Sequence, residues 1–260
     1  MDKVTSADGT PIAFDRIGDG PPVVVVAPAL CDRSDTYALA EHLARHHTVI
    51  NYDRRGRGDS GNTRPYAVLR EVEDIAALIT AAGGAASVYG HSSGAALALH
   101  AAAHGCAIIK LVVHEPPYGP DDADHRAAAR DIAEKIEAAL AEDRRGEAVE
   151  LFLAGAGMPS AMVEQSSRDP RTRAMAPTLG HEFQIMGNVH SGGTVPADLV
   201  RAVRVPTLVI NGGHSPAWMI DSGRRIARHL PAGSHRVLPG QHHMVPPEAL
   251  VPVLTEFLDE

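Results

Sequence analysis

Short apolar runs alternate with helical stretches in this chain, and this alternation constrains the fold more than any other feature. A continuous apolar run at residues 23–26 is typical of a strand that is buried on both faces of a parallel sheet. Further strands are expected at residues 48–52 and 108–114. Amphipathic patterns typical of helices cover residues 35–46 and 66–82. Strands and helices that alternate in this way predict an α/β fold with a mostly parallel sheet flanked by helices.

The alternation is interrupted once, between residues 121 and 192, where helical patterns at residues 124–141, 147–154 and 171–186 occur without a convincing strand. It resumes with a strand at residues 207–210 and a helix at residues 217–229, and it ends with a helix near the C-terminus. We therefore expect an α/β core made of residues 1–117 and 194–260, with a helical cap inserted over residues 118–193. The 260 residues, of which 44% are hydrophobic, are enough for one such core.

Composition restricts the partners of this chain. A formal net charge of −8 disfavours nucleic acid and anionic membrane as partners. The first ten residues lack the apolar segment of a signal peptide, and no run approaches the ~20 apolar residues of a spanning helix. Cys31 and Cys106 form neither a disulfide framework nor a metal-ligand pattern. We expect a cytoplasmic protein with a small-molecule substrate and no metal, and the sequence does not indicate the oligomeric state.

One pentapeptide carries the strongest chemical signal. Gly90-His91-Ser92-Ser93-Gly94 fits the pattern G-x-S-x-G, directly after an expected strand and directly before an expected helix, as a nucleophile elbow requires. The Ser92 hydroxyl would then lie at a helix N-terminus, where developing negative charge is favoured. The alternative is that Ser92 only caps the helix.

This elbow is one of three features that suggest a known family. The others are the glycine-containing loop at residues 52–60 and a pair of adjacent histidines near the C-terminus. In their order along the chain, these features resemble the α/β-hydrolase superfamily over nearly the whole length. The resemblance implies an eight-stranded, mostly parallel sheet. It also implies a mechanism in which a serine, a histidine and an acid cooperate without a cofactor.

The general base is expected on a loop after the last strand, where the chain offers His242 and His243. The family places its histidine three residues after a glycine that ends the strand. This spacing from Gly240 favours His243. His242 remains the neighbouring alternative, and a pair of solvated loop histidines is the non-catalytic one.

The acid departs from the common family pattern. Family members often carry it after the seventh strand as Gly-x-x-Asp, but here Ser215 occupies the Asp position and cannot hold a charge. Glu115, at the end of the strand at residues 108–114, is the best replacement, and certain haloalkane dehalogenases place their acid there. A structural Glu115 that binds backbone N–H groups is the alternative. Weaker candidate acids are Asp121, Asp122 and Asp221.

The family's His-Gly oxyanion motif is also altered, because residues 27–30 read Ala-Pro-Ala-Leu. Alignment makes the Ala29 N–H the second oxyanion donor beside that of Ser93, with Leu30 as the fallback, since proline has no N–H. Leu30, His91 and Trp218 are expected to line the substrate pocket. We interpret the arginine-rich stretch at residues 54–57 as a structural loop rather than an anion site.

The sequence thus predicts a serine hydrolase that cleaves a carboxylic ester through an acyl-enzyme, as carboxylesterases do. A serine nucleophile argues against dehalogenation and epoxide hydrolysis, which form an alkyl-enzyme ester on a carboxylate. Other reactions at the same site remain open, namely thioester, lactone or carbon–carbon bond cleavage and biosynthetic cyclisation. The altered acid and oxyanion motifs also leave open a non-catalytic binding protein.

Overall fold

A computed structural model describes all residues from Met1 to Glu260. One eight-stranded sheet forms the centre, with the strand order β1-β2-β4-β3-β5-β6-β7-β8. The strands are β1 (Asp2–Thr5), β2 (Pro11–Ile17), β3 (Pro22–Val26), β4 (Thr48–Tyr52), β5 (Ala86–His91), β6 (Ile108–His114), β7 (Thr207–Gly212) and β8 (Gly233–Leu238). Strand β2 runs antiparallel to β1 and β4, and all other neighbouring strands are parallel. The predicted α/β fold with an eight-stranded, mostly parallel sheet is confirmed.

Helices cover both faces of this sheet, which explains the apolar strands. Successive side chains of a strand point to opposite faces. Accordingly, Val23 and Val25 of β3 belong to one hydrophobic cluster and Val24 and Val26 to the other. The first cluster includes residues of α1 (Tyr37–Leu43) and α12 (Pro247–Asp259). The second includes residues of α2 (Val68–Ala81), α3 (Ser93–Ala103), α10 (Ala197–Ala202) and α11 (Ala217–His229).

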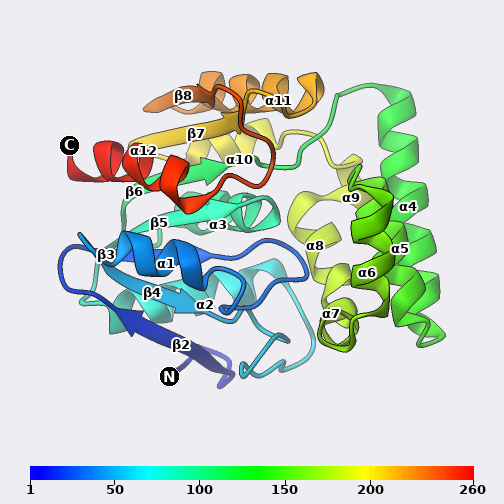
Figure 1. Ribbon diagram of the computed structural model, residues 1–260, viewed down its shortest axis with the longest axis horizontal. Coiled ribbons are helices and arrows are strands. Elements are labelled where there is room, and N and C mark those ends of the chain that lie inside the picture. The colour runs from blue at the N-terminus through cyan, green and yellow to red at the C-terminus, as the bar shows by residue number, and fades with distance from the viewer.

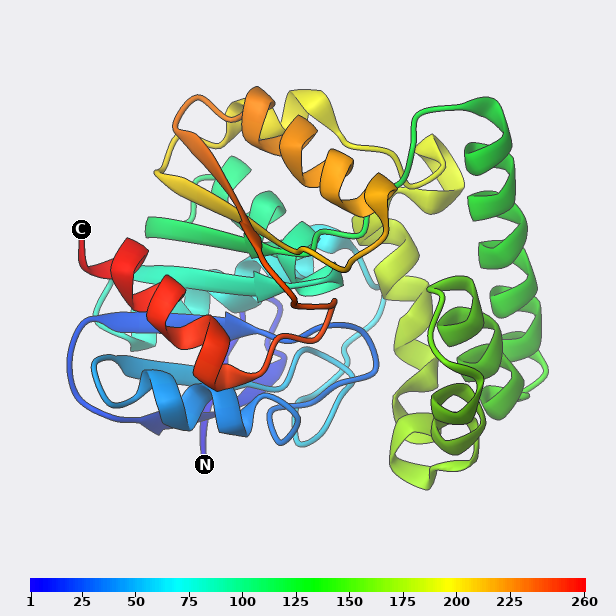
Figure 2. The ribbon, with the colours of Figure 1, turned by 45° about the horizontal axis from the view of Figure 1, so that its top comes forward.

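The segment between β6 and α10 forms a separate group of helices beside the ends of β5 and β6 (Figure 1). We call this group the helical insert. Its elements are α4 (Ala123–Ala141), α5 (Arg145–Gly155), α6 (Ser160–Arg168), α7 (Pro170–Met175), the 3-10 helix η1 (Ala176–Thr178), α8 (Leu179–Met186) and α9 (Asn188–Ser191). Two connecting segments join it to the rest of the chain (Figure 2). They lie side by side, because the Gly119 N–H donates to the Gly193 carbonyl oxygen at 2.9 Å.

Helix α8 is the part of the insert that packs on α2 and α3 of the core. The insert occupies the region predicted as a cap, residues 118–193, and its role as a cap stays a prediction. None of the helices in this structure has the length and apolar character needed to cross a membrane.

The sequence patterns were less reliable inside the insert. The single helix predicted over residues 171–186 is wrong, because α7, η1 and α8 divide this stretch, and Pro177 lies within η1. Helix α6 was not among the predicted helices, and it buries only Val163.

Candidate active site

The sheet topology brings the loops that follow five parallel strands to one edge. Strands β3, β5, β6, β7 and β8 are successive parallel neighbours, so their carboxyl ends lie at the same side of the sheet. Ser92 follows β5, Glu115 follows β6, and the loop with His243 follows β8. Ligands of open α/β sheets bind at this edge, and the predicted nucleophile, acid and base all follow strands that end there.

The elbow has the strained backbone that its sequence predicts. Ser92 has φ 55° and ψ −123°, a conformation that costs about 1–3 kcal/mol in a non-glycine residue and occurs mainly at functional sites. A Cβ at Gly94 would lie 2.3 Å from the Val26 carbonyl oxygen, and a Cβ at Gly90 would lie 2.4 Å from that of Gly94. Only glycine fits at both positions. The Ser92 side chain makes no capping hydrogen bond to α3, which argues against a purely capping role.

His243 and Glu115 are in direct contact. The His243 Nδ1 lies 3.1 Å from Glu115 Oε2, and Glu115 is fully buried. The second oxygen, Oε1, accepts hydrogen bonds from the Gly212 backbone N–H at 2.6 Å and from Asn211 Nδ2 at 3.2 Å. A carboxylate at Nδ1 holds the imidazole proton there and leaves the Nε2 lone pair free to accept a proton.

The charge of Glu115 is stabilised in place. Burial raises its pKa, but the hydrogen bonds from His243 and from the Gly212 N–H outweigh burial and lower the pKa below its ordinary value. The carboxylate is therefore ionised at neutral pH. Ser215 follows β7, at the position where the family usually carries its acid, and its side chain is buried.

A group of neutral histidines supports the loop that carries His243. The His91 Nε2 donates to the His243 carbonyl oxygen at 3.0 Å, and the His91 ring stacks on His114 with centroids 4.6 Å apart. Burial, with smaller contributions from neighbouring histidines, lowers the pKa of His91 well below its ordinary value. Burial likewise lowers the pKa of His114 to about 3. His91 therefore contacts the backbone of the predicted base as an uncharged donor.

The candidate oxyanion donors lie on both sides of the elbow. Ser93 is buried at the start of α3, where the first N–H groups of a helix have no partner within the helix. After β3, Ala29 is half-buried, whereas Leu30 is buried and has a left-handed backbone with φ 56°. Trp218, predicted to line the pocket, is 37% exposed at the start of α11. Its ring lies 6.4 Å from that of His125 in α4, at the junction of core and insert.

Sequence reasoning missed a buried network of charges next to these donors. Arg54, Arg57, Glu71 and Glu182 are each at most 2% exposed. Arg54 binds Glu71 at 2.8 Å and Glu182 at 3.1 Å, and Arg57 also binds Glu182. Burial raises the pKa of Glu71, but Arg54 outweighs it and lowers the pKa to about 2. The two arginines and two acids of this network are thus buried and paired with one another.

Only part of this network left a signal in the sequence. Arg54 and Arg57 stand in a Gly-punctuated loop directly after a buried strand, and Glu71 follows on the next helix. Glu182 lies 125 residues beyond Arg57, so no local pattern connects the two.

Comparison with known proteins agrees with this architecture. A model of the alpha/beta hydrolase family matches residues 23–253. An alpha/beta hydrolase from Sphaerobacter thermophilus is 46% identical, with a TM-score of 0.87 over 99% of this chain and 100% of that chain.

Two more distant structures share the fold. A thermophilic esterase from Thermogutta terrifontis is 24% identical, with a TM-score of 0.73 over 99% of this chain and 97% of its own. An esterase from Exiguobacterium antarcticum is 17% identical, with a TM-score of 0.75 over 99% of both chains. On the family match and the Sphaerobacter structure, this chain belongs to the alpha/beta hydrolase family.

Proposed function

We propose that this hydrolase cleaves carboxylic esters through an acyl-enzyme formed on Ser92, with His243 as general base and Glu115 as the acid that orients it. The observation that carries the proposal is the 3.1 Å contact between His243 Nδ1 and the buried Glu115 carboxylate. This distance lies within the range of about 2.6–3.2 Å expected between a catalytic base and its orienting group. The non-catalytic alternative accounts for the bonds of Glu115 to Gly212 and Asn211, but it gives no reason to hold a half-buried histidine on the same buried carboxylate.

The reaction follows from these roles. The His243 Nε2 removes the hydroxyl proton of Ser92 while Oγ attacks the ester carbonyl. The resulting tetrahedral intermediate collapses, and the alcohol leaves with the proton from His243. Water, deprotonated by the same nitrogen, then attacks the acyl-enzyme and releases the acid and the free serine. The structure contains no hydrogen bond between Ser92 Oγ and His243 Nε2, and in free enzymes such a bond often forms only after substrate binds.

The negative oxygen of the intermediate needs backbone donors. The Ser93 N–H at the start of α3 is one, and the segment after β3 supplies the second. The left-handed backbone of Leu30 supports the Leu30 N–H in this role, because such strain in a buried residue persists where function requires it. Ala29 is the alternative donor. One such donor contributes about 3 kcal/mol to the transition state.

The helical insert is proposed to act as the cap over this site and to select a small-molecule substrate. Trp218 and His125 face each other where the insert meets the core, so they are placed to line the entrance. Thioester, lactone and carbon–carbon bond cleavage would use the same nucleophile, base and oxyanion donors. The ester assignment rests on the chemistry of a serine nucleophile.

Replacement of the nucleophile tests the proposal. The wild-type protein should hydrolyse p-nitrophenyl esters and react with a fluorophosphonate, with the label located on Ser92 by peptide mass spectrometry. Ser92→Ala should abolish both while the circular dichroism spectrum stays unchanged. Ser160→Ala, an exposed serine in α6, is the control and should retain both.

The outcomes separate the alternatives. A wild-type protein that neither hydrolyses these esters nor is labelled at Ser92 contradicts the proposed function and favours a binding protein. A protein that is labelled but turns over no ester uses the same nucleophile for another acyl reaction.

A further inference from the structure

The loop between β3 and α1, residues 27–36, contains both candidate second donors of the oxyanion hole. We call it the β3 loop. The Arg57 Nη1 donates to two of its carbonyl oxygens, that of Pro28 at 2.5 Å and that of Cys31 at 3.0 Å. These two carbonyls flank Ala29 and Leu30, so one guanidinium holds the turn on both sides of the proposed donors.

The geometry of the peptide bond links these carbonyls to the donors. In a planar trans peptide, the C=O of one residue and the N–H of the next point in opposite directions. The hydrogen bond to the Pro28 carbonyl therefore fixes the direction of the Ala29 N–H. The peptide after Cys31 is fixed as well, because the Asp32 N–H donates to Asp35 Oδ2 at 2.9 Å. With both outer peptides held, the peptide that carries the Leu30 N–H has little freedom to rotate.

Arg57 is itself oriented from the helical insert. The Glu182 carboxylate of α8 binds Arg57 through Oε1 and Arg54 through Oε2. Arg54 Nη1 in turn lies 3.4 Å from Ser93 Oγ, next to the other proposed donor. One carboxylate of the insert thus orients two guanidiniums that contact both halves of the oxyanion hole.

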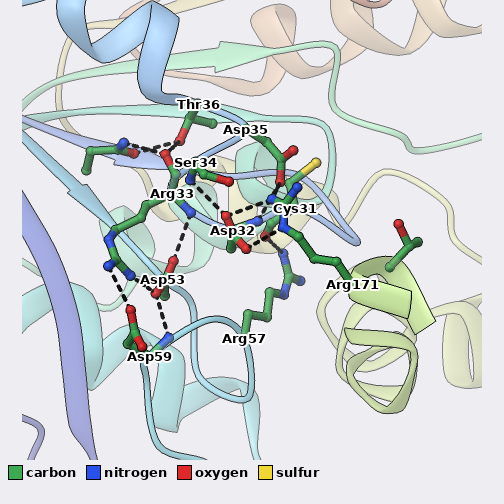
Figure 3. Close-up of polar contacts among 12 residues, drawn as sticks. Cys31, Asp32, Arg33, Ser34, Asp35, Thr36, Asp53, Arg57, Asp59 and Arg171 are labelled. Atoms are coloured by element: carbon green, nitrogen blue, oxygen red, sulfur yellow. Dashed lines mark hydrogen bonds and ion pairs between the residues drawn. The ribbon is translucent and has the colours of Figure 1, made fainter. Parts of the chain in front are cut away.

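A second arginine, Arg171 of the insert, also reaches the β3 loop but is exposed. Figure 3 shows Arg57 and Arg171 extending toward the loop from different segments. Arg171 binds Asp32 at 2.8 and 2.9 Å and also pairs with Asp35, but its side chain is 47% exposed. Exposed pairs contribute about 0–1 kcal/mol and are screened by salt. The contacts of Arg57, in contrast, are buried from water. Arg57 is therefore the arginine suited to hold the β3 loop in a defined geometry.

Stability alone does not explain this buried pair. Burying two charges costs about as much as their attraction returns, and apolar residues of similar volume are often as stable or more so. A charge-assisted hydrogen bond from each guanidinium to one oxygen of Glu182, in contrast, gives both arginines a defined direction.

We propose that Arg57, oriented by Glu182 of the helical insert, is a positioning residue that sets the β3 loop for oxyanion binding. This inference rests on the proposed serine hydrolase function. In this proposal the insert helps to position the oxyanion donors, in addition to any role as a cap over the site. Because the oxyanion forms only in the transition state, loss of the positioning lowers kcat and leaves KM nearly unchanged.

The experiment measures kcat and KM for p-nitrophenyl esters, the rate of fluorophosphonate labelling and the melting temperature. Arg57→Met and Glu182→Gln should lower kcat and the labelling rate by about 10- to 100-fold, since loss of a whole donor costs about 10²–10³. KM should stay within about threefold. Arg57→Lys keeps a charged donor and should recover part of kcat.

The matched control is Arg55→Met, which removes another buried arginine from the same segment. Arg55 binds Asp74 and Asp8 and makes no hydrogen bond to the β3 loop. This variant should lower the melting temperature, while its kcat below that temperature stays within about threefold of wild type.

The proposal is overturned if Arg57→Met and Glu182→Gln lower kcat no more than the Arg55→Met control, or if they raise KM alone. If Arg57→Met does not fold, Glu182→Gln decides, because it preserves volume and can still accept a hydrogen bond. A wild-type protein that the fluorophosphonate does not label refutes the proposed function itself, and the variants then have no bearing on it.

Discussion

Glu115→Gln is the sharpest test of the proposed acid, because the structure determines how the amide must lie. The Oε1 position receives two donors, the Gly212 N–H and Asn211 Nδ2, so the amide oxygen of the glutamine takes that place. The amide NH₂ then faces His243 Nδ1, 3.1 Å away in the wild type, and donates to it. The imidazole proton moves to Nε2, and His243 can no longer accept the proton of Ser92.

The expected loss is large. Forcing a catalytic histidine into the wrong tautomer lowers kcat by about 10⁴, which corresponds to about 5 kcal/mol of transition-state stabilisation. Initial rates with p-nitrophenyl esters and the rate of fluorophosphonate labelling should both fall. The fold should persist, since the substitution keeps the shape of the side chain.

A second substitution sharpens this test. Ser215 is buried and stands after β7, where family members often carry their acid. Ser215→Asp in the Glu115→Gln background should therefore restore part of kcat. The reasoning is refuted if Glu115→Gln folds and keeps more than about a tenth of wild-type kcat. Glu115 would then be a structural residue that binds Gly212 and Asn211.

Two further predictions concern stability. Gly94→Ala places a Cβ 2.3 Å from a carbonyl oxygen of β3 and should cost about 3 kcal/mol or more in urea unfolding. At Gly180 in α8, an added Cβ would meet no atom within 4 Å, so Gly180→Ala should leave the free energy of unfolding unchanged or raise it by up to about 1 kcal/mol. Equal losses of unfolding free energy in both variants would contradict the packing argument. Burial lowers the pKa of His91 well below its ordinary value, that of His114 to about 3 and that of His181 to about 4. Below about pH 6.5, these histidines are therefore protonated in the unfolded chain but remain neutral in the native state. The free energy of unfolding should keep its full value above that pH and should fall toward pH 5 by about 1.4 kcal/mol per pH unit for each of these histidines. Urea titrations that give the same free energy of unfolding across this pH range would contradict the prediction.

Local patterns were sufficient for most of the fold. The strands at residues 48–52 and 108–114 and the helix at residues 217–229 coincide with the structure, because burial on both faces or on one stripe leaves a clear hydrophobic period. The insert was harder to predict, since one expected helix is divided into α7, η1 and α8 and α6 buries only Val163.

The candidate site was likewise predictable only in part. The elbow was readable because its constraints are local: Gly90 and Gly94 are required by atoms of the turn and of the neighbouring strand β3. Glu115 was predicted as the acid from its place at a strand end, and the structure puts it within hydrogen-bond distance of His243. The roles of Arg54 and Arg57 were not readable, because a charged loop residue is usually solvated and their buried partner belongs to the insert.

The sequence by itself thus determined the order of strands and helices, the position of the insert and the elbow around Ser92. These depend on hydrophobic periodicity and on backbone conformations that a few neighbouring residues impose. Only the tertiary structure decided which distant side chains meet. His243 reaches Glu115 across 128 residues and Arg57 reaches Glu182 across 125. Such contacts follow from the order of strands in the sheet and from the packing of α8 on the core, which arise from burial of the whole chain and leave no trace in any short segment.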